Sequence, residues 1–317
     1  MFPILLTIGN FPVSSFGLLL GLGIFFGSFT VWRIARSFDF DAEKIVDLIF
    51  LTIGIGFVFS RAVFVLGNLS FFDSFTKIFF INRYPGLSFW GGLIGGLIFL
   101  WWLSKKNRIP FFRVADIAMI GFFIAAFFAE IGCLLGACGV GIETTFLFSV
   151  DQAGSIGKRL PIQLFEALGF LLVFFTLWKK ILRFHIQGSF LSTGLMLLGI
   201  IKFAALFFKE PVQFFNVGSF QLKLDLVFAG LIFFLGMYLH YKIYKRTPIR
   251  DLSIFLKFFV SSQMQKSLMT KIIRGWYNQK ANFTVRLVNG RKRLFKSLNI
   301  RSNPENFNDK YEHTKKN

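Results

Sequence analysis

The sequence predicts an all-α integral membrane protein with seven transmembrane helices. Two observations carry this prediction. Of the 317 residues, 54% are hydrophobic and only 16% are charged, whereas soluble domains are nearer a quarter charged. The apolar residues also gather in runs long enough to cross ~30 Å of hydrocarbon. This composition excludes an ordinary soluble domain.

The runs are justified in chain order by their length, because a helix needs about 20 apolar residues to span a bilayer. They cover residues 14–35, 45–66, 87–104, 113–137, 161–178, 188–208 and 222–244. The N-terminus lacks a basic region and a small-residue cleavage site, so we expect no removable signal peptide. We divide the chain into a seven-span membrane domain, 1–246, and a basic tail, 247–317. The tail is predicted to be cytoplasmic, partly an interfacial helix and partly disordered.

The connections between the runs alternate in charge, which predicts their sidedness. Lysines and arginines cluster after the first, third, fifth and seventh runs, and the first twelve residues carry none. The positive-inside rule therefore places the N-terminus outside and the C-terminus in the cytoplasm. Residues 67–85 are typical of interfacial helices, and 138–160 of an ordered external loop. Since the +20 net charge gathers in connections and tail, we expect no nucleic-acid partner.

A glycine-rich stretch opens the third run. Residues 86–96 read Gly-Leu-Ser-Phe-Trp-Gly-Gly-Leu-Ile-Gly-Gly. On a helix, Gly91 and Gly92 begin a bare strip with small-xxx-small spacing, along which another backbone can approach closely. Trp90 precedes the strip at the depth where an amphipathic ring meets the bilayer surface. Two interpretations stand: a helix-packing seam, or a glycine-lined wall of an intramembrane cavity.

Polar side chains recur at one depth, in the outer third of six of the expected spans. They are Arg61, Trp90, Glu130, Gln163, Glu166, Lys202, Gln221 and Asp225. Charges at membrane depth are costly and need a partner or a function. Ion pairs between helices would explain any single pair, but so many polar groups at one depth predict a polar site open to the outer leaflet. Its cations suit a phospholipid phosphate.

The residue types of this layer limit its chemistry. It contains no histidine, so a general base there would be a carboxylate, with Glu130 and Glu166 the candidates. Cys133 and Cys138 end an apolar run; their count and spacing are uninformative about a disulfide and are no metal signature. We expect no metal and no cofactor.

Short motifs follow one another over most of residues 10–235. The best preserved is Leu-Pro-Ile-Gln-Leu-Phe-Glu at 160–166. The others are Phe-Gly at 16–17, Phe-Ser-Arg-Ala-Val-Phe-Val at 59–65, the stretch 86–96, Ala-Glu-Ile-Gly-Cys at 129–133, Leu-Gly-Ile-Ile-Lys-Phe at 198–203 extended to Lys209, and Ser-Phe-Gln at 219–221. In order, spacing and topology they resemble the prolipoprotein diacylglyceryl transferase family, whose counterpart of 160–166 is His-Pro-x-Gln-Leu-Tyr-Glu.

The resemblance implies a fold and an activity. The family's members are seven-span bacterial enzymes that transfer the diacylglyceryl group of phosphatidylglycerol to the lipobox cysteine thiol of a prolipoprotein and release glycerol phosphate. This is the first step of lipoprotein maturation. The implied location is the bacterial plasma (inner) membrane, multi-pass, with the active site toward the outer leaflet. The implied partners are phosphatidylglycerol, the signal-peptide and lipobox segment, and membrane lipids.

The resemblance also implies site residues. The catalytic candidates are Glu166, Glu130 and Trp90. The phospholipid-binding candidates are Arg61, Lys202, Gln163, Gly91, Gly92, Gln221 and Glu130. Three of these positions depart from the family motifs. Trp90 replaces a histidine, and Glu130 and Lys202 each replace an arginine. Indole cannot accept a proton at neutral pH, and lysine lacks the bidentate guanidinium.

Two alternatives to the transferase stay open at this stage. One is a catalytically altered relative that binds or transfers another lipid-linked group. The other is a membrane transporter built on an unrelated seven-span bundle. Paired half-repeats would favour a transporter, and the two halves of this sequence do not mirror each other, so the transporter ranks last.

Overall fold

A computed structural model describes residues 4–8, 11–38, 40–72, 74–80, 84, 86–136, 138–152, 154–181, 186–210, 214–217, 220–248, 251 and 270. The chain divides into two units, Met1–Lys245 and Arg246–Asn317. The first unit holds the elements discussed below. The interfacial helix and the disorder expected in the tail fall almost entirely outside the described residues.

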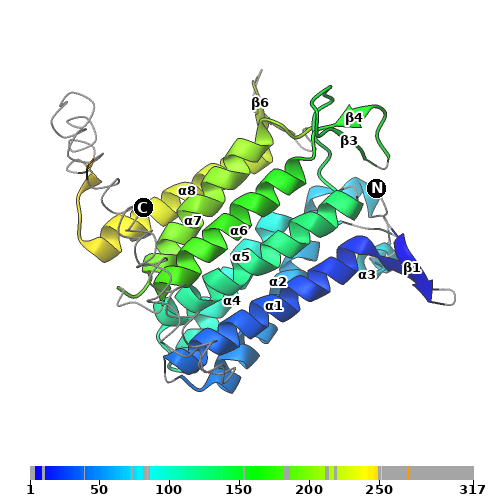
Figure 1. The fold of residues 1–317 in the computed structure, drawn as a ribbon. Helices are drawn as coiled ribbons and strands as arrows, with labels where there is room; N and C mark the ends of the chain where they lie inside the picture. The colour runs from blue at the N-terminus through cyan, green and yellow to red at the C-terminus, as the bar shows by residue number, and fades with distance from the viewer. Residues whose placement is uncertain are drawn as a thin grey trace, which may run out of the picture. The chain divides into compact units, whose positions relative to one another are not determined.

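Seven long helices form most of the described part of the first unit (Figure 1). They are α1 (Ser15–Ser37), α2 (Ala42–Gly67), α4 (Phe89–Lys106), α5 (Phe111–Gly136), α6 (Ile162–Ile181), α7 (Ser189–Leu206) and α8 (Leu224–Tyr244). Six of them, all except α4, are long and apolar enough to cross a membrane. The all-α class with membrane-length helices is thus confirmed. The helix α4 contains the four glycines and ends in two lysines, which lower its mean hydropathy.

Short elements join the long helices. A 3-10 helix, η1 (Leu69–Phe71), and a short helix, α3 (Phe75–Phe79), lie in the connection where interfacial helices were expected. Three antiparallel hairpins complete the described part. They are β1 (Ile4–Ile8) with β2 (Phe11–Ser14), β3 (Val150–Asp151) with β4 (Lys158–Arg159), and β5 (Phe214–Val217) with β6 (Phe220–Lys223).

Side-chain caps set the starts of three helices. The hydroxyl of Ser14 accepts from Gly17 N at 3.1 Å, and the carboxylate of Asp41 accepts from Lys44 N at 3.2 Å. At the start of α4, the hydroxyl of Ser88 accepts a bond of 3.2 Å from Gly91 N. Each cap satisfies a backbone N–H that the first turn of a helix leaves without a partner.

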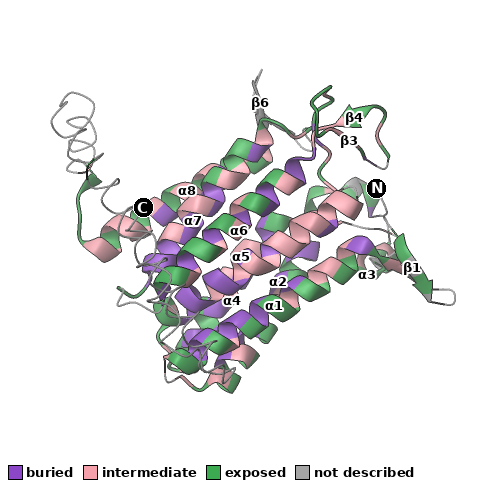
Figure 2. Cartoon of the chain, in the orientation of Figure 1, coloured by how far each residue is buried: buried purple, intermediate pink, exposed green. Residues whose placement is uncertain are grey.

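Helix α5 is central to the bundle, since it packs against α1, α4, α6 and α7. Its Phe123 is fully buried and meets the equally buried Phe170 of α6. A Cβ atom on Gly27 would lie 2.9 Å from the carbonyl oxygen of Gly121, so α1 approaches α5 closely only because glycine stands there. Outward-facing residues are apolar as well, for example Leu172 at 66% exposed, and Figure 2 shows such exposed positions along the helices. Apolar outer faces are what a lipid environment requires.

The glycine strip of α4 packs against α2. A Cβ atom on Gly91 would lie 2.6 Å from Cβ of Val63, and one on Gly95 would lie 2.4 Å from Cβ of Phe59. Gly92 faces the same helix. The packing-seam interpretation therefore describes this strip, and the lipid-binding role of Gly91 and Gly92 stays a prediction.

Candidate active site

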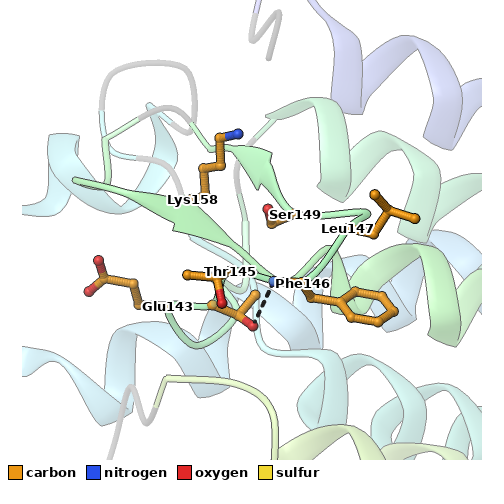
Figure 3. A pocket seen from close by; sticks show the side chains of 7 residues that line it. Glu143, Thr145, Phe146, Leu147, Ser149 and Lys158 are labelled. Carbon is orange, nitrogen blue, oxygen red and sulfur yellow. Dashed lines mark hydrogen bonds between the residues drawn. The ribbon is translucent and has the colours of Figure 1, made fainter.

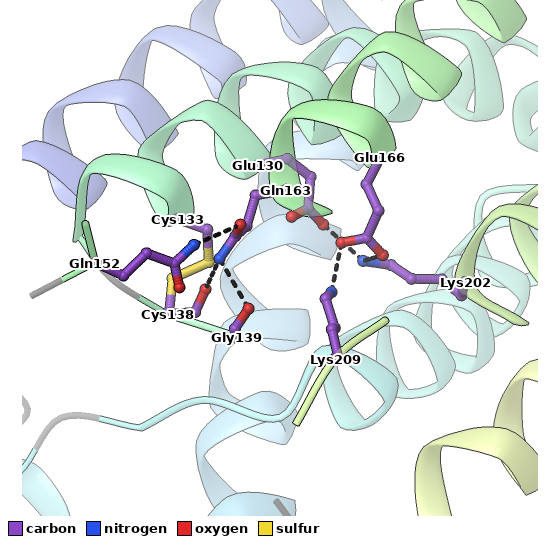
Figure 4. Close-up of a disulfide and its surroundings, with 9 residues drawn as sticks. All are labelled: Glu130, Cys133, Cys138, Gly139, Gln152, Gln163, Glu166, Lys202 and Lys209. Atoms are coloured by element: carbon purple, nitrogen blue, oxygen red, sulfur yellow. Dashed lines mark hydrogen bonds and ion pairs between the residues drawn. A yellow bond between two sulfur atoms is a disulfide. The ribbon is translucent and has the colours of Figure 1, made fainter. Parts of the chain in front are cut away.

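Two carboxylates and two lysines meet at one end of the helix bundle (Figure 4). Lys202 Nζ lies 2.6 Å from Glu130 Oε1 and 3.1 Å from Glu166 Oε1. Lys209 Nζ pairs with the other oxygen of Glu166, Oε2. We call these four residues the ionic cluster. Its formal charges cancel, and Glu166 bridges the two lysines.

Antiparallel packing explains how residues far apart in the chain form the cluster. Glu130 lies near the end of α5, Glu166 near the start of α6, and Lys202 near the end of α7. Because consecutive helices run in opposite directions and α5 contacts both α6 and α7, these three positions reach the same end of the bundle. Lys209 follows the end of α7 and folds back towards α6.

The cluster is buried, so its charges depend on one another. The side chain of Glu166 is 1% exposed, those of Lys202 and Glu130 are 11% and 12% exposed, and that of Lys209 is 19% exposed. Burying one charge alone is far more costly than burying a hydrogen-bonded pair. The Lys202 ammonium also lies 4.6 Å from the ring centroid of Phe89 and 5.3 Å from that of Phe170. Aromatic walls of this kind exclude water and strengthen electrostatic interactions.

Gln163 lies one helical turn before Glu166 and is completely buried. Its Nε2 donates to the carbonyl oxygens of Cys138 and Gly139, at 2.8 Å each. Its Oε1 accepts a bond of 3.2 Å from Gln152 Nε2. The side chain of Gln163 thus ties α6 to the segment that follows α5, residues 138–142.

Backbone pairing places Lys209 beside the same segment. Glu210 N donates to the carbonyl of Val140, and Ile142 N donates to the carbonyl of Phe208, at 3.0 Å each. Lys209 forms an antiparallel bridge with Gly141 between these two bonds. The segment after α5 therefore contacts both α6, through Gln163, and the residues that carry Lys209.

A disulfide joins Cys133, in the last turn of α5, to Cys138, the first described residue of that segment. In Figure 4 the disulfide lies next to Gln163, with the ionic cluster beyond it. The sequence had left this pairing open. Among the described residues, no group of three or more His, Cys, Asp or Glu side chains is placed to hold a metal ion.

Other predicted site residues have different surroundings. Arg61 donates to the backbone carbonyls of Ile78, Gly86 and Lys77 at 2.8–2.9 Å. It therefore secures the connection between α2 and α4, and its predicted contact with phospholipid stays a prediction. Trp90 Nε1 donates to Asp225 Oδ1 at 2.9 Å.

Gln221 lies on β6, where its backbone pairs with Asn216. Of the predicted site residues, the structure thus brings together Glu130, Glu166 and Lys202, with Gln163 beside them. Lys209 was missed as a site residue. The available signal was its position at the end of the motif that begins at residue 198, where the resemblance places an arginine.

A separate hollow of about 920 Å³ lies on the loop that carries β3 and β4 (Figure 3). Its lining includes Glu143, Thr145, Phe146 and Lys158. Within this lining, Phe146 N donates a hydrogen bond of 3.2 Å to Thr144 Oγ1. All of these residues belong to one loop, whereas the ionic cluster draws on three helices. The cluster is therefore the candidate active site.

Membrane-length helices with a buried, charge-balanced cluster at one end of their bundle define an integral membrane protein with a buried polar site. The family model for prolipoprotein diacylglyceryl transferase matches residues 3–247. The chain belongs to the prolipoprotein diacylglyceryl transferase family. The resemblance drawn from the motifs is confirmed.

Several curated relatives bear the name phosphatidylglycerol–prolipoprotein diacylglyceryl transferase. The one from Deinococcus radiodurans is 34% identical over 149 residues, which cover 45% of this chain and 43% of that protein. A second, from Clostridium perfringens, is 25% identical over 239 residues, or 74% of this chain and 91% of its own length. The match to a Bacillus cereus relative is 25% over 228 residues, or 63% of this chain and 84% of that protein. The match thus spans less than half of the Deinococcus protein.

Proposed function

We propose that this protein transfers the diacylglyceryl group of phosphatidylglycerol to the lipobox cysteine thiol of prolipoproteins, the first step of lipoprotein maturation. The observation that carries the proposal is the ionic cluster, which puts two lysines and two carboxylates in a water-poor site. Family membership supplies the reaction class.

The reaction needs two kinds of group. The thiol sulfur attacks the carbon of the diacylglyceryl group that bears the phosphate oxygen. A C–S bond forms, the C–O bond breaks, and glycerol phosphate leaves with the electron pair while the thiol proton passes to a base. Fixed cations stabilise the leaving phosphate, and a carboxylate takes the proton because the thiolate is the nucleophile.

Lys202 and Lys209 are the cations in this mechanism. Both reach the cluster from the end of α7, and each is already held by a carboxylate. An incoming phosphate offers charge-assisted hydrogen bonds to the same ammonium groups. Gln163, one turn before Glu166, completes the polar wall of the site.

The two carboxylates take different roles. Glu166 meets a lysine through each of its oxygens and its side chain is 1% exposed, so it positions the lysines. Glu130 meets Lys202 through Oε1 and its side chain is 12% exposed. We assign acceptance of the thiol proton to Glu130, since its pairing with Lys202 loosens once that lysine turns to the phosphate.

The remaining predicted residues support the site. Arg61 holds the connection that leads into α4, and Trp90 holds Asp225 at the start of α8. Gly91 and Gly92 keep α4 close to α2, and so help to place Phe89, whose ring contacts Lys202. Gln221 lies at the entrance to α8. These residues shape the approach of phospholipid and signal peptide.

The proposed topology has seven spans, with α4 as the third, and an outer N-terminus. The last turns of α1, α4 and α6 carry Arg36, Lys105, Lys106, Lys179 and Lys180, at the end of the bundle opposite the cluster. Under the positive-inside rule the basic end faces the cytoplasm and the cluster faces the outer leaflet of the plasma membrane. A disulfide at the cluster end suits the oxidising side of the membrane.

A catalytically altered relative is the second candidate. The observation that favours it is Glu130, which neutralises Lys202 at a position where the family motif has an arginine. Such a protein would bind a lipid-linked group and leave the thioether unformed.

Activity in vesicles separates the two candidates. Purified protein in phosphatidylglycerol vesicles with a lipobox peptide is expected to give a thioether-linked diacylglyceryl peptide, detected by mass spectrometry. Lys202→Ala and Lys209→Ala should each lower the rate by about 100-fold or more, since each removes a cation from the leaving phosphate. The matched control is Lys180→Ala, because Lys180 is exposed and lies at the end of α6 away from the ionic cluster. Absence of product where another family member turns over would reject the transferase proposal and favour the altered relative.

A further inference from the structure

The disulfide between Cys133 and Cys138 has two structural routes to the ionic cluster. The first route runs through Gln163. Cys138 and the next residue, Gly139, present their carbonyl oxygens to Gln163 Nε2 at 2.8 Å each. Since Gln163 is completely buried, its amide cannot turn to water if these carbonyls move away.

The second route runs through Lys209. Val140 and Ile142, just beyond the disulfide, pair through their backbones with Glu210 and Phe208. These bonds bracket Lys209, whose ammonium pairs with Glu166. Lys209 also approaches Gly139, because a Cβ atom on this glycine would lie 3.6 Å from Lys209 Cε.

Cys133 anchors the starting point of both routes. It lies three residues beyond Glu130 on α5, so the disulfide ties the segment that begins at Cys138 to the helix that carries one of the carboxylates of the site. The sequence separation between the two cysteines is only 5. A short loop of this kind restricts the unfolded chain less than a long one, which makes a local role more important than a global one.

We propose that the Cys133–Cys138 disulfide is a positioning element of the active site, which holds Gln163 and Lys209 in place for the reaction. The proposal rests on the proposed function only for its activity measurement. Reduction takes up two electrons and two protons and leaves two thiols. The backbone segment then loses its covalent tie to α5.

A redox experiment on the purified full chain tests this role. A phosphine reductant is suitable because it becomes a phosphine oxide and carries no thiol to compete with the acceptor cysteine. We expect reduction to lower kcat by about 10- to 100-fold, as misplacing reacting groups by about 1 Å does. The KM for phosphatidylglycerol should change less, and reoxidation should restore the rate.

Substitution supports the redox result. The double variant Cys133→Ser, Cys138→Ser should have the low rate of the reduced protein and no response to the reductant. Gln163→Met keeps the side-chain length and removes the amide. If the disulfide acts through Gln163, the loss of rate in the double cysteine variant and the loss in Gln163→Met are expected to be non-additive when the changes are combined. Full activity of the double cysteine variant, or strictly additive losses, would overturn the route through Gln163.

A measurement without turnover separates this proposal from the proposed function. Acylation rates of single lysines, followed by mass spectrometry, report whether Lys209 stays paired. Reduction should raise the rate at Lys209 by about tenfold, the effect of ~1.4 kcal/mol of lost protection, and leave exposed Lys180 unchanged. If no thioether forms in any redox state but Lys209 responds, the proposed function fails and the positioning role stands. An unchanged rate at Lys209 after complete reduction would refute the route through Lys209.

Discussion

The indole Nε1 of Trp90 donates a hydrogen bond of 2.9 Å to Oδ1 of Asp225, which joins the start of α4 to the start of α8. Trp90 stands where the family motif has a histidine. The carboxylate of Asp225 therefore lies beside the position where the family motif has an ionisable imidazole and this chain has an indole. The ring of Trp90 also packs at 5.1 Å from that of Phe89, which in turn contacts Lys202.

Trp90→His should place an imidazole between Asp225 and the cluster. One ring nitrogen can donate to Asp225 as the indole does, and the other can accept a proton. We expect the rate of thioether formation to rise, with a new dependence on pH over about 6 to 7, where imidazole loses its proton. Trp90→Gln retains a donor without a titrating base and is the control. An equal effect of both variants would contradict this explanation.

Lys202 and Glu130 should contribute unequally to stability, although they form one ion pair. Lys202→Met leaves the buried Glu130 without its cation, and breaking a buried pair in this way costs about 3–5 kcal/mol in free energy of unfolding. Glu130→Gln should cost less, because Lys202 keeps Glu166 at 3.1 Å. Denaturant unfolding in detergent measures both values. A larger loss for Glu130→Gln would show that Glu166 does not hold Lys202.

Arg61 is expected to act as a structural residue of the α2–α4 connection. Arg61→Ala removes donors from three backbone carbonyls, and should lower the free energy of unfolding by about 3 kcal/mol or more, because hydrogen bonds to charged groups are worth about 1.5–3 kcal/mol each. Arg61→Lys should restore little, since an ammonium lacks the planar fork. Hydrogen exchange of residues 77–88 is the direct measurement. Unchanged exchange with lost phospholipid binding would favour the predicted phosphate contact instead.

Gly95→Ala should separate α4 from α2. The new Cβ atom would lie 2.4 Å from both Cβ and Cγ of Phe59, and overpacking of this kind costs about 1–3 kcal/mol. Phe59→Ala in the same chain removes Cγ and the ring but keeps Cβ, so it should recover part of the loss. Gly230→Ala, whose Cβ would meet nothing within 4 Å, is the matched control and should be neutral or slightly stabilising. Thermal unfolding in detergent compares the four proteins.

Much of the fold followed from composition and run length. Each of the seven long helices coincides with an apolar run, and six of them are long and apolar enough to cross a membrane. A helix that crosses a membrane satisfies its backbone internally and presents apolar side chains to lipid. The shared depth of Glu130, Glu166 and Lys202 could be predicted from their positions within these runs. Because consecutive helices run in opposite directions, these positions reach the same end of the bundle. The family could be recognised because the motifs follow one another along the chain in the order and spacing that the family has.

Only the tertiary structure decided which polar groups meet. Residue depth does not determine the direction in which a side chain points, so Arg61 and Lys202 looked alike in the sequence although one serves backbone carbonyls and the other two carboxylates. Lys209 lies beyond its helix and is placed by backbone pairing with a distant segment, a contact that periodicity cannot encode. The disulfide was equally hidden, because two cysteines pair according to the path of the chain between them.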